Sequence, residues 1–69
     1  MRLSARNQIK GTVKAVTKGA TTSHVSVDIG GGNTVMASIT NEAVDDLAVK
    51  SGARVMVVIK ASDVMIAVD

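Results

Sequence analysis

Two stretches near the C-terminus are apolar at every position. They cover residues 55–59 and 64–68 and flank the short segment Lys60-Ala61-Ser62-Asp63. Strands of this kind occur where both faces of a sheet are covered, whereas half-exposed strands alternate apolar and polar residues. A small barrel covers only its inner face, so the outer face of these stretches would form an exposed apolar patch. The sequence therefore predicts a homo-oligomer in which a neighbouring subunit covers that patch.

The size of the chain supports the same expectation. It has 69 residues, no aromatic side chain and no cysteine. Its core must therefore be aliphatic and lacks disulfide support, and small domains of this kind gain stability by association. The only predicted helix is needed to plug the barrel, so no spare segment remains to cover the patch.

A long polar and apolar alternation begins the chain. Over residues 2–18 the odd positions include Leu3, Ile9 and Val13, and most even positions are polar. A period of two predicts a strand. Gly11 is where a bulge or a sharp bend costs least. Residues 3–17 are therefore interpreted as one bent strand or two collinear strands.

The middle of the chain predicts a hairpin. Residues 25–29 and 35–39 alternate in the same way, and Gly30-Gly31-Gly32-Asn33 lies between them. Glycine and asparagine adopt the positive φ angles that tight hairpin turns require.

A short helix follows the hairpin. Thr40 or Asn41 can cap its N-terminus, and the acid Glu42 interacts favourably with the helix dipole in the first turn. Val44, Leu47 and Ala48 form an apolar stripe along it. The helix is expected to end near residues 51–52. The resulting order of three strands, a helix and two strands predicts an all-β fold: a five-stranded OB-like barrel with one short helix between strands 3 and 4, in a single domain over residues 1–69.

Several functions are disfavoured by composition. Without cysteine and with one histidine, thiolate and histidine metal sites within a subunit are not expected. No nucleophile, base and orienting group can be named together, so the chain is not expected to be an enzyme. No apolar run is long enough for a transmembrane helix and no signal peptide is recognised, so a cytoplasmic protein without a membrane partner is expected.

The formal charge of +2 fits an anionic partner. The basic residues of the first strand recur every four positions and are expected on one face of it. They are Arg2, Arg6, Lys10, Lys14 and Lys18. For the three lysines a solvated face that blocks edge-to-edge aggregation is the favoured interpretation. Single-stranded nucleic acid is disfavoured, because such barrels stack bases on aromatic side chains that this chain lacks.

Two segments offer donors for a small oxyanion. Ser4 and Arg6 place a hydroxyl and a guanidinium on the same side of a strand. Lys60 and Ser62 add an ammonium and a hydroxyl at a turn, together with free backbone N–H groups. Considered singly, each residue is more simply explained as an ordinary strand end or turn residue.

The quoted segments together resemble one known family. The sequence SARNQIKG near the start, the GGGN hairpin followed by TVMASIT, and the closing VIKASDVMIAV are similar to molbindins, small molybdate-binding proteins built from one Mop (TOBE-like) domain. The resemblance implies an OB-like barrel assembled as a hexamer, a trimer of dimers, that binds molybdate or tungstate at subunit interfaces in the cytoplasm for molybdenum storage and homeostasis.

The resemblance also assigns residues. It implies that Ser4 and Arg6 of one subunit bind the oxyanion together with Lys60, the backbone N–H of Ala61, and Ser62 of a neighbour. Thr40 resembles a further contact. Molybdenum would be held as the oxyanion, without direct protein ligands to the metal and without an organic cofactor. The alternatives are a nucleic-acid-binding OB module and a pure assembly domain.

Overall fold

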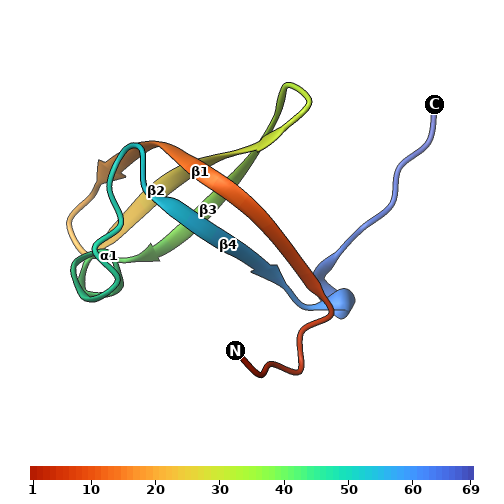
Figure 1. The fold of residues 1–69 in the computed structure, drawn as a ribbon, viewed down its shortest axis with the longest axis horizontal. Helices are drawn as coiled ribbons and strands as arrows, with labels where there is room; N and C mark the ends of the chain where they lie inside the picture. Colours follow the sequence, from red (N-terminus) through yellow and green to blue (C-terminus); the bar gives the residue numbers. More distant parts are fainter.

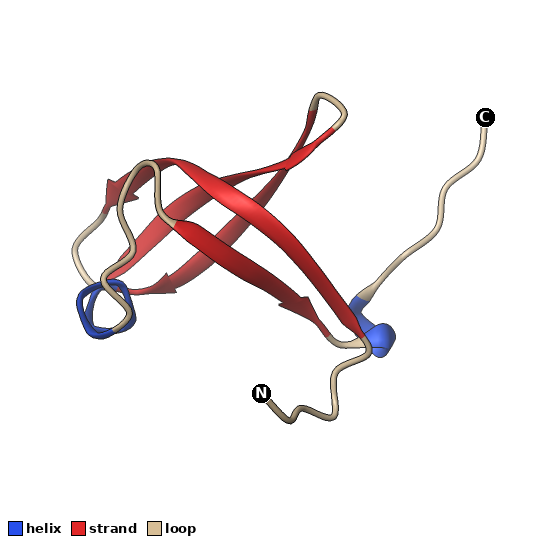
Figure 2. Cartoon of the chain, viewed as in Figure 1, coloured by secondary structure: helices blue, strands red, loops and turns tan.

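The computed structural model describes residues 1–69 as a curled antiparallel sheet with one short helix at its side (Figures 1 and 2). The predicted all-β class with a helix between the third and fourth strands is confirmed. Neither helical segment has the length or apolar character needed to cross a membrane. The elements are β1 (Asn7–Lys18), β2 (Thr22–Gly30), β3 (Asn33–Thr40), α1 (Asn41–Asp46), β4 (Arg54–Ile59) and the 3-10 turn η1 (Ala61–Asp63).

β1 joins the two halves of the sheet. Residues 7–12 pair with β4 and residues 12–18 pair with β2, which gives the strand order β3-β2-β1-β4. The partner changes at Thr12, and the sheet curls into a half-barrel there (Figure 1). The sequence left open whether residues 3–17 form one bent strand or two collinear strands. The structure has one bent strand, which begins at Asn7 rather than at residue 3.

Gly11 lies at the bend but is not the bulge. The register of β1 against β2 shifts between Val13 and Ala15, so Lys14 is the extra residue. A Cβ on Gly11 would come within 2.5 Å of Val27 Cγ1 and 2.9 Å of the Asp28 carbonyl oxygen. Glycine is therefore required here for the close approach of β2 to β1. The extra residue of the bulge lies three positions further along β1, at Lys14.

The bulge breaks the predicted basic row. Val13 and Val16 lie opposite Val27 and Val25, so the inward positions change from odd to even numbers at the bulge. Lys18 consequently lies on the face of buried Ser23, and its Nζ is 3.3 Å from Asp45 Oδ1 of α1. Arg2 and Arg6 precede the strand. The prediction that all five basic residues share one strand face is wrong.

The hairpin prediction is confirmed. Gly30 pairs with Asn33, which leaves a loop of Gly31 and Gly32 with φ angles of 62° and 79°. Positive φ at both loop residues matches the twist of the flanking strands. The N–H of Gly30 donates to Asp28 Oδ1 at 2.8 Å, which fixes the start of the turn.

α1 covers one end of the small core. The buried apolar residues are Val13, Val25, Val27 and Val44, the last from α1. Thr40 is the N-cap, and its Oγ1 accepts a hydrogen bond from the N–H of Ala43 at 3.1 Å. The helix ends at Asp46, earlier than predicted, because Ala48 adopts a left-handed φ of 52°. Leu47 is therefore 71% exposed, and the predicted apolar stripe is reduced to Val44.

Residues 64–69 form an extended tail. They pair with no strand of the chain, and Met65, Ile66 and Val68 are 92%, 86% and 93% exposed. The tail leaves η1 and runs away from the sheet (Figure 1). The sheet therefore has four strands, and the fifth strand predicted over residues 64–68 does not form within the chain.

Candidate oxyanion site

The two predicted donor segments meet at one end of the β1–β4 pair. Asn7 opens β1 opposite Ile59, the last residue of β4, and Asn7 Nδ2 donates to the Ile59 carbonyl at 3.2 Å. Ser4 and Arg6 directly precede this pair of residues, and η1 directly follows it (Figure 1). Two segments that are more than fifty positions apart in the sequence therefore lie side by side in one chain.

The charged and hydroxyl side chains of these segments have no partner within the chain. Ser4, Arg6, Lys60 and Ser62 are all exposed, and none of them donates or accepts a side-chain hydrogen bond. The one salt bridge joins Lys18 to Asp45 elsewhere. The two cations are therefore available to an external anion.

The turn after β4 adds backbone donors. Lys60 is the N-cap of η1, and the N–H groups of Asp63 and Val64 donate to the carbonyls of Lys60 and Ala61 at 2.9 and 3.3 Å. The N–H groups of Ala61 and Ser62 come earlier and have no acceptor within the turn, as in any first helical turn. The Asp63 carboxylate belongs to the same turn and is the one acid in it.

Thr40 lies far from this cluster. It pairs with Thr22 at the end of the sheet where β1 finishes, whereas Ser4 and Arg6 precede the start of β1. β1 separates these ends, and its contour length along the bend is roughly 36 Å at about 3.3 Å per residue. Thr40 faces a separate surface cavity of about 420 Å³, lined also by Ala20, Thr21, Asn41 and Glu42. The structure does not bring Thr40 together with the other five predicted residues.

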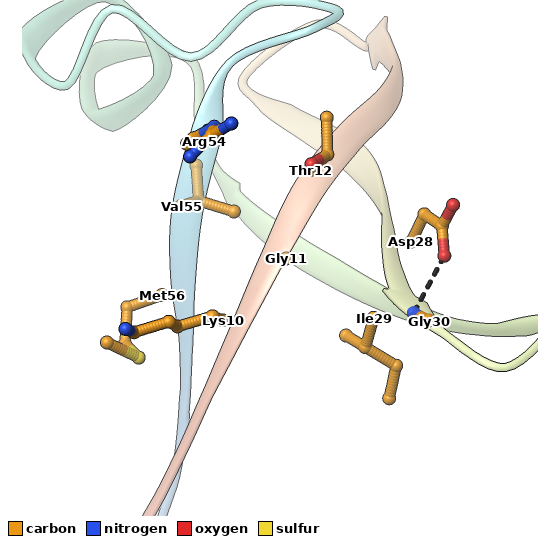
Figure 3. A pocket seen from close by; sticks show the side chains of 9 residues that line it. All are labelled: Lys10, Gly11, Thr12, Asp28, Ile29, Gly30, Arg54, Val55 and Met56. Atoms are coloured by element: carbon orange, nitrogen blue, oxygen red, sulfur yellow. Dashed lines mark hydrogen bonds between the residues drawn. The ribbon is translucent and has the colours of Figure 1, made fainter.

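A second concave region lies on the open side of the half-barrel. This groove of about 540 Å³ lies between β1, β2 and β4, and Gly11, Ile29 and Val55 are among the residues that line it (Figure 3). Lys10 and Arg54 also line it. The sequence did not predict the groove, because the groove depends on the change of pairing partner along β1, which is a long-range feature. The glycine at position 11, where β2 approaches β1 closely, is the one local sign of it.

No group of three or more His, Cys, Asp or Glu side chains is placed to hold a metal ion. His24 is exposed on β2, opposite Thr17 and Ser38.

Comparison with known proteins identifies relatives of the chain in both sequence and fold. The TOBE domain model matches residues 3–66. Molybdenum-pterin-binding protein 3 of Clostridium pasteurianum is 48% identical over 66 residues, which cover 96% of this chain and 97% of that protein. The structure of MopII from the same organism has a TM-score of 0.90 at 43% identity and covers 97% of this chain and 100% of its own.

A third similar protein is ModG, described as a cytoplasmic molybdate-binding protein and solved with molybdate bound. Its TM-score is 0.90 at 45% identity, over 94% of this chain and 46% of the ModG chain. The family match spans nearly the whole chain, and the relatives resemble it in both sequence and fold. The chain therefore belongs to the TOBE-domain family and, within it, to the molbindins, the group of the Mop proteins.

Proposed function

We propose that this chain, acting as one Mop domain over residues 1–69, is a homo-oligomeric molybdate-binding protein that stores molybdenum in the cytoplasm. The observation that carries the proposal is the convergence of two unpaired cations, Arg6 and Lys60, at the Asn7–Ile59 end of the sheet. The names of the Mop relatives and the molybdate bound to ModG support the ligand. The description of ModG as cytoplasmic supports the location.

The donor set suits a tetrahedral dianion. Arg6 and Lys60 neutralise its two charges, and Ser4, Ser62 and the Ala61 N–H donate to its oxygens. A dianion removed from water needs both charge compensation and a donor for each oxygen it buries. Tungstate has the same charge and shape and binds in the same way. A set composed of donors disfavours protonated phosphate, whose own O–H requires an acceptor.

The site lies between subunits in this proposal. In one chain the five donors are exposed on one side of the sheet end, and an exposed site cannot exclude water from a dianion. Thr40 lies at the opposite end of β1, so it can join the site only from another chain. Its Oγ1 accepts from Ala43, which leaves its O–H free to donate. The resemblance to molbindins implies a hexamer built as a trimer of dimers.

The binding involves no chemical transformation. The ligand enters and leaves as the same oxyanion, and the proteins similar to this chain are named as binding proteins. We therefore propose a storage and homeostasis role rather than catalysis. The nucleic-acid alternative loses its main support, because the bulge at Lys14 removes the continuous basic row.

Calorimetric titration tests the proposal. The chain is titrated separately with molybdate, tungstate, sulfate and phosphate at one pH and one ionic strength. Molybdate and tungstate are expected to bind, with sulfate and phosphate at least tenfold weaker. Equal heats for the four anions would contradict a selective site, and an oligomer that takes up none of them would be a pure assembly domain.

A further inference from the structure

Asp63 brings a negative charge into the turn that supplies the donors. Its backbone N–H donates to the Lys60 carbonyl at 2.9 Å, and this hydrogen bond closes η1. A turn closed in this way keeps the Cα atoms of its first and last residues within about 7 Å of one another. The Asp63 carboxylate is therefore carried by the donor turn itself, next to Lys60 and Ser62.

The other acids of the chain lie elsewhere. No acid precedes Asp28 in the sequence, so the segment that holds Arg6 contains none. The acids of α1 lie at the opposite end of the sheet, and Asp69 ends a tail that runs away from it (Figure 1). Asp63 is therefore the one acid that the chain places beside the two cations of the site.

The Asp63 carboxylate does not hold the turn together. Its side chain is exposed, makes no hydrogen bond and takes no part in the one salt bridge of the chain. The turn is closed by a backbone N–H, which every residue except proline supplies. The fold of the chain therefore does not require an acid at this position.

We propose that Asp63 limits the affinity of the oxyanion site by repelling the bound ligand. The inference rests on the proposed function and adds a residue that opposes binding. Arg6 and Lys60 together balance the two charges of the dianion, so Asp63 leaves the occupied site with one excess negative charge. The ligand is therefore held more weakly than the five donors alone would hold it, which allows a storage protein to release what it binds.

Coulomb's law gives the size of the repulsion. A unit negative charge about 7 Å from a dianion in water lowers the binding constant about sevenfold, and a less polar environment increases this factor. The repulsion depends on the charge of the ligand and not on its chemical identity. Removal of the Asp63 charge should therefore raise the affinities for molybdate and for sulfate, which are both dianions, by the same factor.

Isothermal titration of the full chain with molybdate, and with sulfate in competition, tests the proposal. Asp63→Asn keeps the shape of the side chain without its charge, whereas Asp63→Ala also avoids the new N–H donor of asparagine. Both neutral variants are expected to bind molybdate at least about fivefold more tightly than the parent, with an unchanged ratio of molybdate to sulfate affinity. Asp63→Glu retains the charge and should keep an affinity close to that of the parent.

Asp28→Asn is the matched control. It removes the same charge from β2, and its amide oxygen can still accept the hydrogen bond that the Gly30 N–H donates to Asp28 Oδ1. Asp28 pairs with Thr12 in the middle of β1, away from the end where the donors lie. This variant should bind molybdate as the parent does. Light scattering at one protein concentration verifies that all variants assemble alike.

The outcomes separate this inference from the proposed function. Parent-like or weaker molybdate binding by both neutral variants, or an equal gain in Asp28→Asn, would overturn the inference and leave the proposed function in place. A change in the ratio of molybdate to sulfate affinity would also overturn it, because Asp63 would then shape the site rather than repel the ligand. Oxyanion uptake by the neutral variants alone would support it. If neither the parent nor the neutral variants bind any oxyanion, the proposed function is wrong and the inference is overturned with it.

Discussion

Gly11 and Val27 approach one another so closely that a Cβ on Gly11 would lie 2.5 Å from Val27 Cγ1. Val27 is one of the five buried residues and is 3% exposed, so it has little room to move. Gly11→Ala is therefore expected to destabilise the fold by about 1–3 kcal/mol, the usual range for an overpacked core.

Chemical denaturation measures this change at one fixed protein concentration, since the stability of any chain that associates depends on its concentration. Lys10→Ala, on the adjacent outward position, serves as the control and should stay within about 0.5 kcal/mol of the parent. A Gly11→Ala protein as stable as the control would mean that β2 can withdraw from β1 at this point.

Ala48 offers a substitution in the opposite direction. Its φ of 52° lies in the left-handed region directly after α1, where glycine is the usual residue. Ala48→Gly is expected to stabilise the chain by about 0.5–1 kcal/mol, because relief of the steric cost exceeds the added freedom of the unfolded chain. Thermal unfolding should show a higher midpoint. A lower midpoint would indicate that the Ala48 methyl makes a contact worth more than the relieved strain.

Thr40 has a structural role that can be separated from ligand binding. Its hydroxyl caps α1, so Thr40→Ala should cost about 1 kcal/mol of stability, whereas Thr40→Ser should retain most of the cap. If Thr40 also contacts the oxyanion, molybdate affinity should follow the hydroxyl: kept in the serine variant and reduced in the alanine variant. Equal affinity in both variants would limit Thr40 to capping.

Arg6 and Lys60 should matter most for binding. Arg6→Ala or Lys60→Ala is expected to lower molybdate affinity at least tenfold, because a hydrogen bond to a charged group contributes about 1.5–3 kcal/mol. Lys14→Ala removes the same charge from the bulge of β1 and is the matched control. Isothermal titration compares the three. Parent-like affinity in both the Arg6 and Lys60 variants would refute the assignment of the site.

The local features of the fold were predictable from the sequence. The alternation around Gly30-Gly31-Gly32-Asn33 predicts the hairpin, and Thr40 is correctly named as one of two cap candidates, because turn and cap chemistry depend on neighbours in the sequence. The bulge at Lys14 was missed. Near it, the run Lys14-Ala15-Val16 keeps an acceptable alternation in either register, so only the pairing with β2 reveals which residue is extra.

Long-range features were predictable only in part. Ser4, Arg6, Lys60 and Ser62 could be named as oxyanion donors, but their convergence follows from the pairing of Asn7 with Ile59, which no local pattern encodes. The apolar character of residues 64–68 predicts a partner strand, and the chain itself supplies none. It does not say which strand or which chain supplies that partner, since every sheet edge offers the same backbone groups.

The double pairing of β1 has a consequence for how the molecule opens. One continuous backbone carries the ladder to β2 along one half and the ladder to β4 along the other. Neither β2 nor β4 can separate from β1 without loosening the pairing of the other strand at Thr12. We therefore expect the amide protons of β1 to exchange with solvent last, and both halves of the sheet to unfold in a single cooperative step.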